Sequence, residues 1–210
     1  MKNIILYAVI VFMLLGCAVS RKVDYDSVYA NVPAFNQKIS IATLDQREQV
    51  VSGARKTDFV GYTRSGAGIA YPMGTTSGRP FADLVSENIS SSLSSKGSTT
   101  SVVITKTNEE DTAILGKLKK TGNNKLVFIN CKEFYTDGYG ATSLMYNLVV
   151  NIYSADGALL KQKNFSGKKP LGGTVAWGPG KYKQYMPEAF KNLIEEIFND
   201  AEIDAALKNS

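Results

Sequence analysis

The segment from Lys125 to Tyr135 constrains the fold more than any other part of this sequence. It opens with Leu126-Val-Phe-Ile-Asn-Cys131, in which consecutive residues, rather than every second residue, are mostly apolar. A strand that is apolar on both faces lies inside a sheet that is covered on both sides. We therefore expect a central strand here, with helices packed on the sheet. Within this strand, Cys131 is expected to be an inert core thiol and not a nucleophile.

The segments on either side of this strand predict a mixed α/β fold built on one sheet. Strands are expected at 38–44, 101–106 and about 158–165. Another strand carries five alternating apolar residues on one face: Leu144, Tyr146, Leu148, Val150 and Ile152. Helices are expected at 80–96, between Thr107 and Gly122, from Pro187 onward and at 201–207. The order β-α-β-α-β-β-β-α gives about five strands, parallel in the early βαβ units and antiparallel in the later meander.

Local signals predict the ends of these elements. Pro80 fits the first turn of a helix, Thr107 and Glu110 match a capping box, and Pro187 fits the first helical position. Asp156-Gly157 is typical of a hairpin turn. The Gly-rich segments 61–78 and 168–183 are expected to be surface loops from their composition. The first of them carries no phosphate-binding glycine motif. Long loops of this kind often carry binding surfaces.

The first 20 residues have the layout of a secretory leader. Lys2 is followed by the apolar run Ile4–Leu15 and by the small residues Gly16, Cys17 and Ala18. Leu14-Leu-Gly-Cys17 resembles the bacterial lipobox, in which the Cys thiol is alkylated by a diacylglycerol and becomes the mature N-terminus. We therefore predict acylated Cys17 and a lipid bilayer as its partner. An uncleaved transmembrane anchor is the alternative reading, since no charge lies between Lys2 and Arg21.

This leader divides the chain into three expected parts. Residues 1–16 are expected to be the signal peptide, 17–37 the lipidated Cys and a flexible tether, and 38–210 a single α/β domain. Removal of residues 1–16 from the 210 leaves 194, enough for one domain with a core. Ala18 stands where an Asp tends to retain enteric lipoproteins in the inner membrane, so we expect the outer membrane, facing the periplasm.

Composition narrows the function classes further. The chain has no His, which removes the commonest general base and the commonest zinc ligand. The net charge of +5 is mild and diffuse, so nucleic acid is not an expected partner. We expect no enzyme activity, no cofactor and no metal.

Two groups of residues are candidates for binding. Asp45 and Arg47 lie where the first strand of the domain ends, and a structural ion pair is the alternative to a ligand site. The segment around 161–185 mixes lysines with aromatic residues and predicts contact with anionic headgroups or an acidic polymer; a solvated basic face is the alternative. The candidates in this segment are Lys168, Lys169, Trp177, Lys181 and Tyr182.

The lipobox leader, the strand ending in Asp45-Gln-Arg47, the helix opening with Phe81-Ala-Asp-Leu-Val and the Tyr146-Asn147 strand resemble the YajG-like family of bacterial lipoproteins. A more distant resemblance is to the α/β domains of transport-auxiliary and secretion-pore lipoproteins. The resemblance implies an α/β periplasmic domain and carries no catalytic residues with it.

Two functional hypotheses follow. The first is a non-catalytic accessory or interaction domain in a transport, secretion or surface assembly, with an envelope protein or a second copy of the chain as partner. The second is a lipid- or glycan-binding module. A hydrolase is a third and weaker reading, because no nucleophile motif is present.

Overall fold

The computed structural model describes residues 21–208 except for residues 66, 138–140 and 175–181. Within this part of the chain, eight strands form one sheet: β1 (Lys22–Val23), β2 (Lys38–Asp45), β3 (Phe59–Arg64), β4 (Ala70–Thr75), β5 (Thr99–Val102), β6 (Lys125–Asp137), β7 (Ala141–Ser154) and β8 (Leu159–Thr174). Five helices accompany them: α2 (Glu48–Val51), α3 (Phe81–Ser94), α4 (Asp111–Lys120), α5 (Tyr182–Phe198) and α6 (Ala201–Lys208). The mixed α/β class is confirmed, whereas the expected number of strands was too low.

The sheet is organised around β6, as expected from its apolar sequence. The strand order is β1-β4-β3-β6-β2-β5, and β7 and β8 continue from β6 on its other edge. β2 is parallel to both β5 and β6, while β6, β7 and β8 form an antiparallel meander. Both pairing types agree with the prediction. The first half of β6 pairs with β2 and its last two residues pair with β3, so β6 connects all parts of the sheet.

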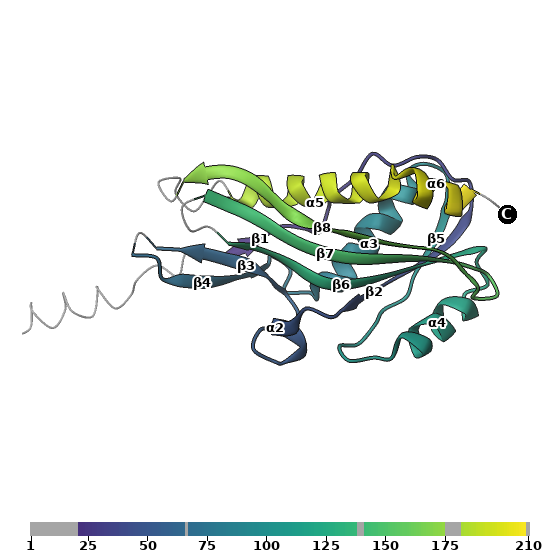
Figure 1. The fold of residues 1–210 in the computed structure, drawn as a ribbon, viewed down its shortest axis with the longest axis horizontal. Coiled ribbons are helices and arrows are strands. Elements are labelled where there is room, and N and C mark those ends of the chain that lie inside the picture. Colours follow the sequence, from purple (N-terminus) through teal and green to yellow (C-terminus); the bar gives the residue numbers. More distant parts are fainter. Residues whose placement is uncertain (1–20, 66, 138–140, 175–181, 209–210) are drawn as a thin grey trace, which may run out of the picture.

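Helices cover the two faces of the sheet unequally (Figure 1). On one face, α3, α5 and α6 enclose a large core that includes all five alternating residues predicted for β7. On the other face, α4 packs Ile114 and Leu118 over a small core with Leu126 and Phe128 of β6. β6 is thus buried on both faces near its start, which explains its continuous apolar run.

Four aromatic rings form the centre of the large core. Phe81 of α3 stacks on Phe134 of β6 with ring centroids 4.3 Å apart. Tyr25 meets Phe81, Phe134 and Phe190 of α5 edge-on, with centroids 5.5, 6.1 and 5.4 Å away. All four side chains are fully buried or nearly so. This cluster joins the N-terminal segment, α3, β6 and α5 in one contact.

Tyr25 provides a test of this packing. Its hydroxyl is buried and has no hydrogen-bond partner among the described residues, and burial raises the pKa of the phenol, so that it stays protonated. Tyr25→Phe removes the unsatisfied hydroxyl and keeps the ring. We expect a gain of about 1 kcal/mol in the free energy of unfolding, measured by urea denaturation. A loss of stability would mean that the hydroxyl has a partner. Tyr29, which is 61% exposed, gives a matched control, and Tyr29→Phe should change little.

Residues 21–37 correct the prediction of a flexible tether over 17–37. They run across the domain and bury six apolar side chains: Val23, Tyr25, Val28, Ala30, Val32 and Phe35. Two polar side chains of α3 hold the backbone, because Asn88 Oδ1 accepts from Val28 N and Ser92 Oγ accepts from Ala30 N, each at 3.0 Å. Val23 and Tyr25, and then Val28, Ala30 and Val32, alternate with exposed residues, but this period is short and interrupted, and the polar composition of the segment favoured a tether.

The segment expected as a loop at 61–78 is also different in the structure. β3 and β4 form an antiparallel hairpin there, and a bidentate ion pair at 2.6 Å joins Arg64 to Asp137 at the end of β6. The predicted 168–183 loop begins too early, because β8 continues to Thr174 and pairs Lys168 with Met145.

Several element ends differ from expectation by a few residues. Pro187 lies inside α5, which begins at Tyr182. The predicted capping box is wrong, because α4 begins at Asp111 with Glu110 as its N-cap residue and without a side-chain cap.

Among the described residues, no helix is both long and apolar enough to cross a membrane.

Candidate functional site

Asp45 and Arg47 form a buried ion pair at the end of β2. Arg47 Nε donates to Asp45 Oδ1 at 2.8 Å, and a terminal nitrogen of Arg47 donates to Oδ2 at 2.6 Å. Both side chains are about 95% buried. The remaining guanidinium N–H groups donate to three main-chain carbonyls: Thr57, Phe59 and Phe134. Arg47 therefore ties β2 to β3 and β6, and we call this arrangement the Arg47 clasp.

The electrostatics of the Arg47 clasp fit a structural role. Burial by itself would lower the pKa of Arg47, but the hydrogen bonds to Asp45 and the charges around it outweigh burial and raise the pKa above its usual value. The guanidinium is therefore always charged. A guanidinium has five N–H donors, and each of them faces an acceptor within the domain. None is left to bind a ligand.

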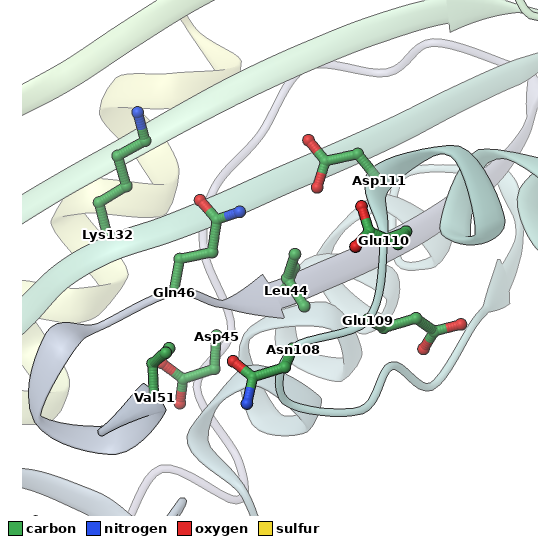
Figure 2. Close-up of a pocket in the computed structure, with 9 residues that line it drawn as sticks. All are labelled: Leu44, Asp45, Gln46, Val51, Asn108, Glu109, Glu110, Asp111 and Lys132. Atoms are coloured by element: carbon green, nitrogen blue, oxygen red, sulfur yellow. The ribbon is translucent and has the colours of Figure 1, made fainter. Parts of the chain in front are cut away.

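A hollow lies beside the β2 terminus, and Asp45 of the Arg47 clasp is part of its lining (Figure 2). We call it the strand-end pocket, and it has a volume of about 620 Å³. It opens between the end of β2, α2, the start of α4 and the side chain of Lys132. Its lining is Leu44, Asp45, Gln46, Val51, Asn108, Glu109, Glu110, Asp111 and Lys132. In sheets with parallel strands, the carboxyl ends of the strands are a frequent place for ligands.

The charged groups of the strand-end pocket are mainly acidic, and they lie beside the apolar side chains of Leu44 and Val51. Glu109 pairs with Lys117 and accepts from the main-chain N–H of Lys106 at 3.0 Å, and these hydrogen bonds hold the pKa of Glu109 below its usual value. A carboxylate in that state is a poor proton donor at neutral pH. Figure 2 shows Lys132 and Gln46 on one side of the pocket and the carboxylates of Glu110 and Asp111 on the other.

A row of amide side chains leads from this pocket across the sheet. Asn130 Nδ2 donates to the Asp111 carboxylate at 3.3 Å, Asn151 Nδ2 donates to Asn130 Oδ1 at 3.1 Å, and Gln162 Nε2 donates to Asn151 Oδ1 at 2.7 Å. The row satisfies the polar groups of Asn130 and Asn151, which are both buried. It gives Asp111 a fixed partner, and the pocket has groups that suit a ligand rich in hydroxyl or cationic groups. Among the residues that the structure describes, no group of metal-ligating side chains is assembled.

Sequence reasoning did not nominate most of the strand-end pocket. Gln46 follows β2, Asn108 precedes α4 and Lys132 lies in the middle of β6, so three distant segments meet there. The available signal was the position of Gln46 and Asn108 just beyond two parallel strands, β2 and β5. This positional signal was not accompanied by a residue motif, and each of these side chains is common at protein surfaces.

Three lysines of the 161–185 segment that the structure describes have acidic partners. Lys163 pairs with Asp200 at 2.7 Å, Lys161 pairs with Glu202, and Lys169 pairs with Glu196. These partners lie on α5, on α6 and at the turn between them, so the ion pairs attach the C-terminal helices to β8. Lys168 is exposed.

Several predicted residues are not placed by the structure. Cys17, Trp177 and Lys181 lie outside the described residues. Tyr182 begins α5, but its side chain also lies outside the described part.

Cys131 behaves as the core thiol that its sequence context predicts. It is fully buried beside the Arg47 clasp, and burial raises the pKa of its thiol to about 12. At neutral pH the thiol is protonated and out of contact with solvent, so it lacks both requirements of a reactive cysteine.

No protein-family model matches this sequence, and no curated protein matches it. Solved structures with a similar course of the chain include protein XCC0632 from Xanthomonas campestris, with 11% identity, a TM-score of 0.48, and 89% of this chain and 92% of that chain covered. Lipoprotein GNA1162 from Neisseria meningitidis has 14% identity and a TM-score of 0.31, and the match covers 76% of this chain and 99% of that chain. Uncharacterized lipoprotein B from Nitrosomonas europaea has 10% identity and a TM-score of 0.38, and the match covers 87% of this chain and 92% of that chain. Two of these three are bacterial lipoproteins by name, and at this distance no ligand or partner is transferred from them.

Proposed function

We propose that this protein is a bacterial envelope lipoprotein whose folded part is a non-catalytic interaction domain. The observation that carries the proposal is the leader with Leu14-Leu-Gly-Cys17 at its end. Diacylation and N-acylation of Cys17 would supply enough buried CH₂ groups, at about 0.8 kcal/mol each, to hold the protein stably on a membrane. A YajG-like affiliation and an outer-membrane location facing the periplasm are the finer parts of this proposal.

The short distance in sequence between Cys17 and the first strand of the domain supports an arrangement in which the domain is anchored at the membrane. β1 starts at Lys22, five residues after Cys17, and packs into the sheet beside β4. An acylated Cys17 would therefore hold the domain directly at the bilayer surface. In such an arrangement the domain has a fixed side toward its membrane and presents the other sides to envelope partners or to a second copy.

A second function, binding of a glycan, is favoured by the strand-end pocket. Its lining offers an amide, carboxylates and an ammonium group around an open hollow of about 620 Å³. Carboxylates and amides accept and donate the hydrogen bonds that sugar hydroxyls make. A lipid tail needs an enclosed cavity without charged groups, whereas this pocket is open and carries carboxylates and Lys132, so within the lipid-or-glycan alternative it favours a glycan.

Substitution of the lipobox cysteine tests the anchor. In a bacterial host, we expect the wild-type protein to fractionate with membranes and to carry acyl chains on Cys17 in an intact-mass measurement. Cys17→Ala should abolish acylation and move nearly all of the protein out of the membrane fraction, because no acyl chain remains to be buried. Cys131→Val is the matched control, since it removes the other cysteine from the core and should leave fractionation unchanged. Membrane-extracted wild-type protein with an unmodified Cys17 would overturn the proposal.

A further inference from the structure

We propose that the end of the sheet where β4 begins faces the anchoring leaflet, with Ile69 and Tyr71 at the phospholipid interface. This inference rests on the proposed acylation of Cys17 and specifies which surface of the domain meets the lipid. We call the residues Ile69, Ala70, Tyr71 and Pro72 the β4-start patch.

The covalent reach of the chain limits where the anchor can be. Cys17 is four residues before Arg21, and a chain spans at most about 3.5 Å per residue, so Cys17 lies within about 14 Å of Arg21. Arg21 is fixed to the sheet, because its carbonyl accepts from Gly74 N at 3.1 Å. The acyl chains of Cys17 therefore enter the bilayer close to β4 and not at a distance of several nanometres.

The direction of β1 selects the side of the domain. β1 is parallel to β4 and pairs Lys22 with Gly74 and Val23 with Thr75, near the end of β4. The chain therefore enters β1 from the side on which β4 begins. The Arg21 side chain confirms this relation, since its guanidinium carbon lies 3.7 Å from the centroid of the Tyr71 ring. The anchor and the β4-start patch thus belong to the same end of the sheet.

The β4-start patch has the chemistry of a membrane interface. Ile69 is 57% exposed, Ala70 and Pro72 are also exposed, and Tyr71 is half-buried under Arg21. An isolated exposed Ile needs no explanation, but here it adjoins a Tyr and an Arg within reach of a lipid anchor. Apolar and aromatic side chains enter the headgroup region of a bilayer, while Arg and Lys contact phosphates there.

Basic residues from other strands lie at the same end. Tyr62, Asp137, Ser143 and Pro170 form one row across β3, β6, β7 and β8, and Lys168 lies two residues from this row. Asp137 is engaged by Arg64, which lies two residues beyond Tyr62 on β3. Figure 1 shows the β3–β4 hairpin, the start of β7 and the end of β8 together at one end of the molecule. With Arg21 and exposed Lys168, this end suits an anionic leaflet, to which each nearby cationic residue adds about 1 kcal/mol.

Two single-cysteine positions allow the orientation to be measured on the full acylated protein. Leu159 is a matched control for Ile69, because the two side chains are 52% and 57% exposed. Leu159 lies in the row of Leu126, eleven residues along β6 from Asp137, which is about 35 Å toward the opposite end of the sheet. Cys17 would be acylated and Cys131 is fully buried, so an environment-sensitive fluorophore should react with the introduced thiol alone.

The variants Ile69→Cys and Leu159→Cys would be labelled and reconstituted into vesicles of phosphatidylcholine and phosphatidylglycerol that carry a headgroup nitroxide. We expect the label at position 69 to be quenched several-fold more than the label at position 159. Equal quenching at the two positions, or stronger quenching at position 159, would overturn the orientation while flotation with the vesicles leaves the anchor intact. Failure of the acyl-free Cys17→Ala protein to differ from wild type in flotation would instead reject the anchor, and the orientation with it.

Discussion

Asp45→Ala is expected to lower the free energy of unfolding by about 3–5 kcal/mol. The variant leaves the Arg47 guanidinium about 95% buried without its counter-charge and without two of its hydrogen-bond acceptors. A buried ion without a partner costs far more than the net value of an intact pair. Urea denaturation followed by circular dichroism would measure the change.

The double variant Asp45→Leu with Arg47→Met separates the two contributions. It removes both charges and keeps apolar volume, so it should recover most of the stability that Asp45→Ala loses. Glu87→Ala is the control for an exposed pair, because Arg79 and Glu87 are each about 40% exposed and their ion pair should contribute little. A double variant as unstable as Asp45→Ala would mean that the carbonyl contacts of Arg47, not the charge pair, hold the clasp together.

The parts of the fold that could be predicted from sequence are those whose burial imposes a period. Leu144 to Ile152 alternates because one face of β7 packs on the core and the other does not. β6 is apolar at consecutive positions because both of its faces are covered near its start. In each case the side-chain pattern records the contacts that the strand makes in the folded domain.

The parts that could not be predicted gain their structure from pairing rather than from their own pattern. β4 contains Pro72 and is surrounded by Gly, Ser and Thr, which favour a loop, yet it lies between β1 and β3 in the sheet. The last part of β8 contains Gly167, Pro170 and Gly172 and still pairs with β7 through two register shifts. Such segments become strands because the neighbouring strand offers main-chain partners, and single-residue propensities do not contain that information.

The same distinction applies to the candidate sites. Asp45 and Arg47 are two residues apart, so their pairing could be proposed from the sequence, although the carbonyls of Thr57, Phe59 and Phe134 could not be foreseen. The strand-end pocket is assembled from three segments and depends on the parallel order of β5, β2 and β6. The pocket can therefore be predicted only once the order and direction of the strands in the sheet are known.

Gly61→Ala is the second substitution with a large expected effect, because Gly61 is where β3 crosses closest to β6. Its φ of +146° is a conformation that L-residues rarely adopt. A Cβ atom at this position would lie 2.4 Å from Thr136 Oγ1 and 2.6 Å from the main-chain N and O of Thr136. Since two of these atoms belong to the backbone of a central strand, a rotamer change cannot relieve the contact. We expect a loss of about 2–4 kcal/mol in the free energy of unfolding from strain and crowding together.

Gly53→Ala separates crowding from backbone strain. Gly53 also has a positive φ, +76°, but a Cβ atom there would meet nothing within 4 Å. It should therefore lose only the conformational part, about 1–2 kcal/mol. Equal losses in the two variants, measured by thermal and urea unfolding, would show that the contact with Thr136 is unimportant. A larger loss for Gly61→Ala would show that a Cβ atom beside Thr136 disturbs the pairing of β3 with β6, through which the β3–β4 hairpin and its β4-start patch join the sheet.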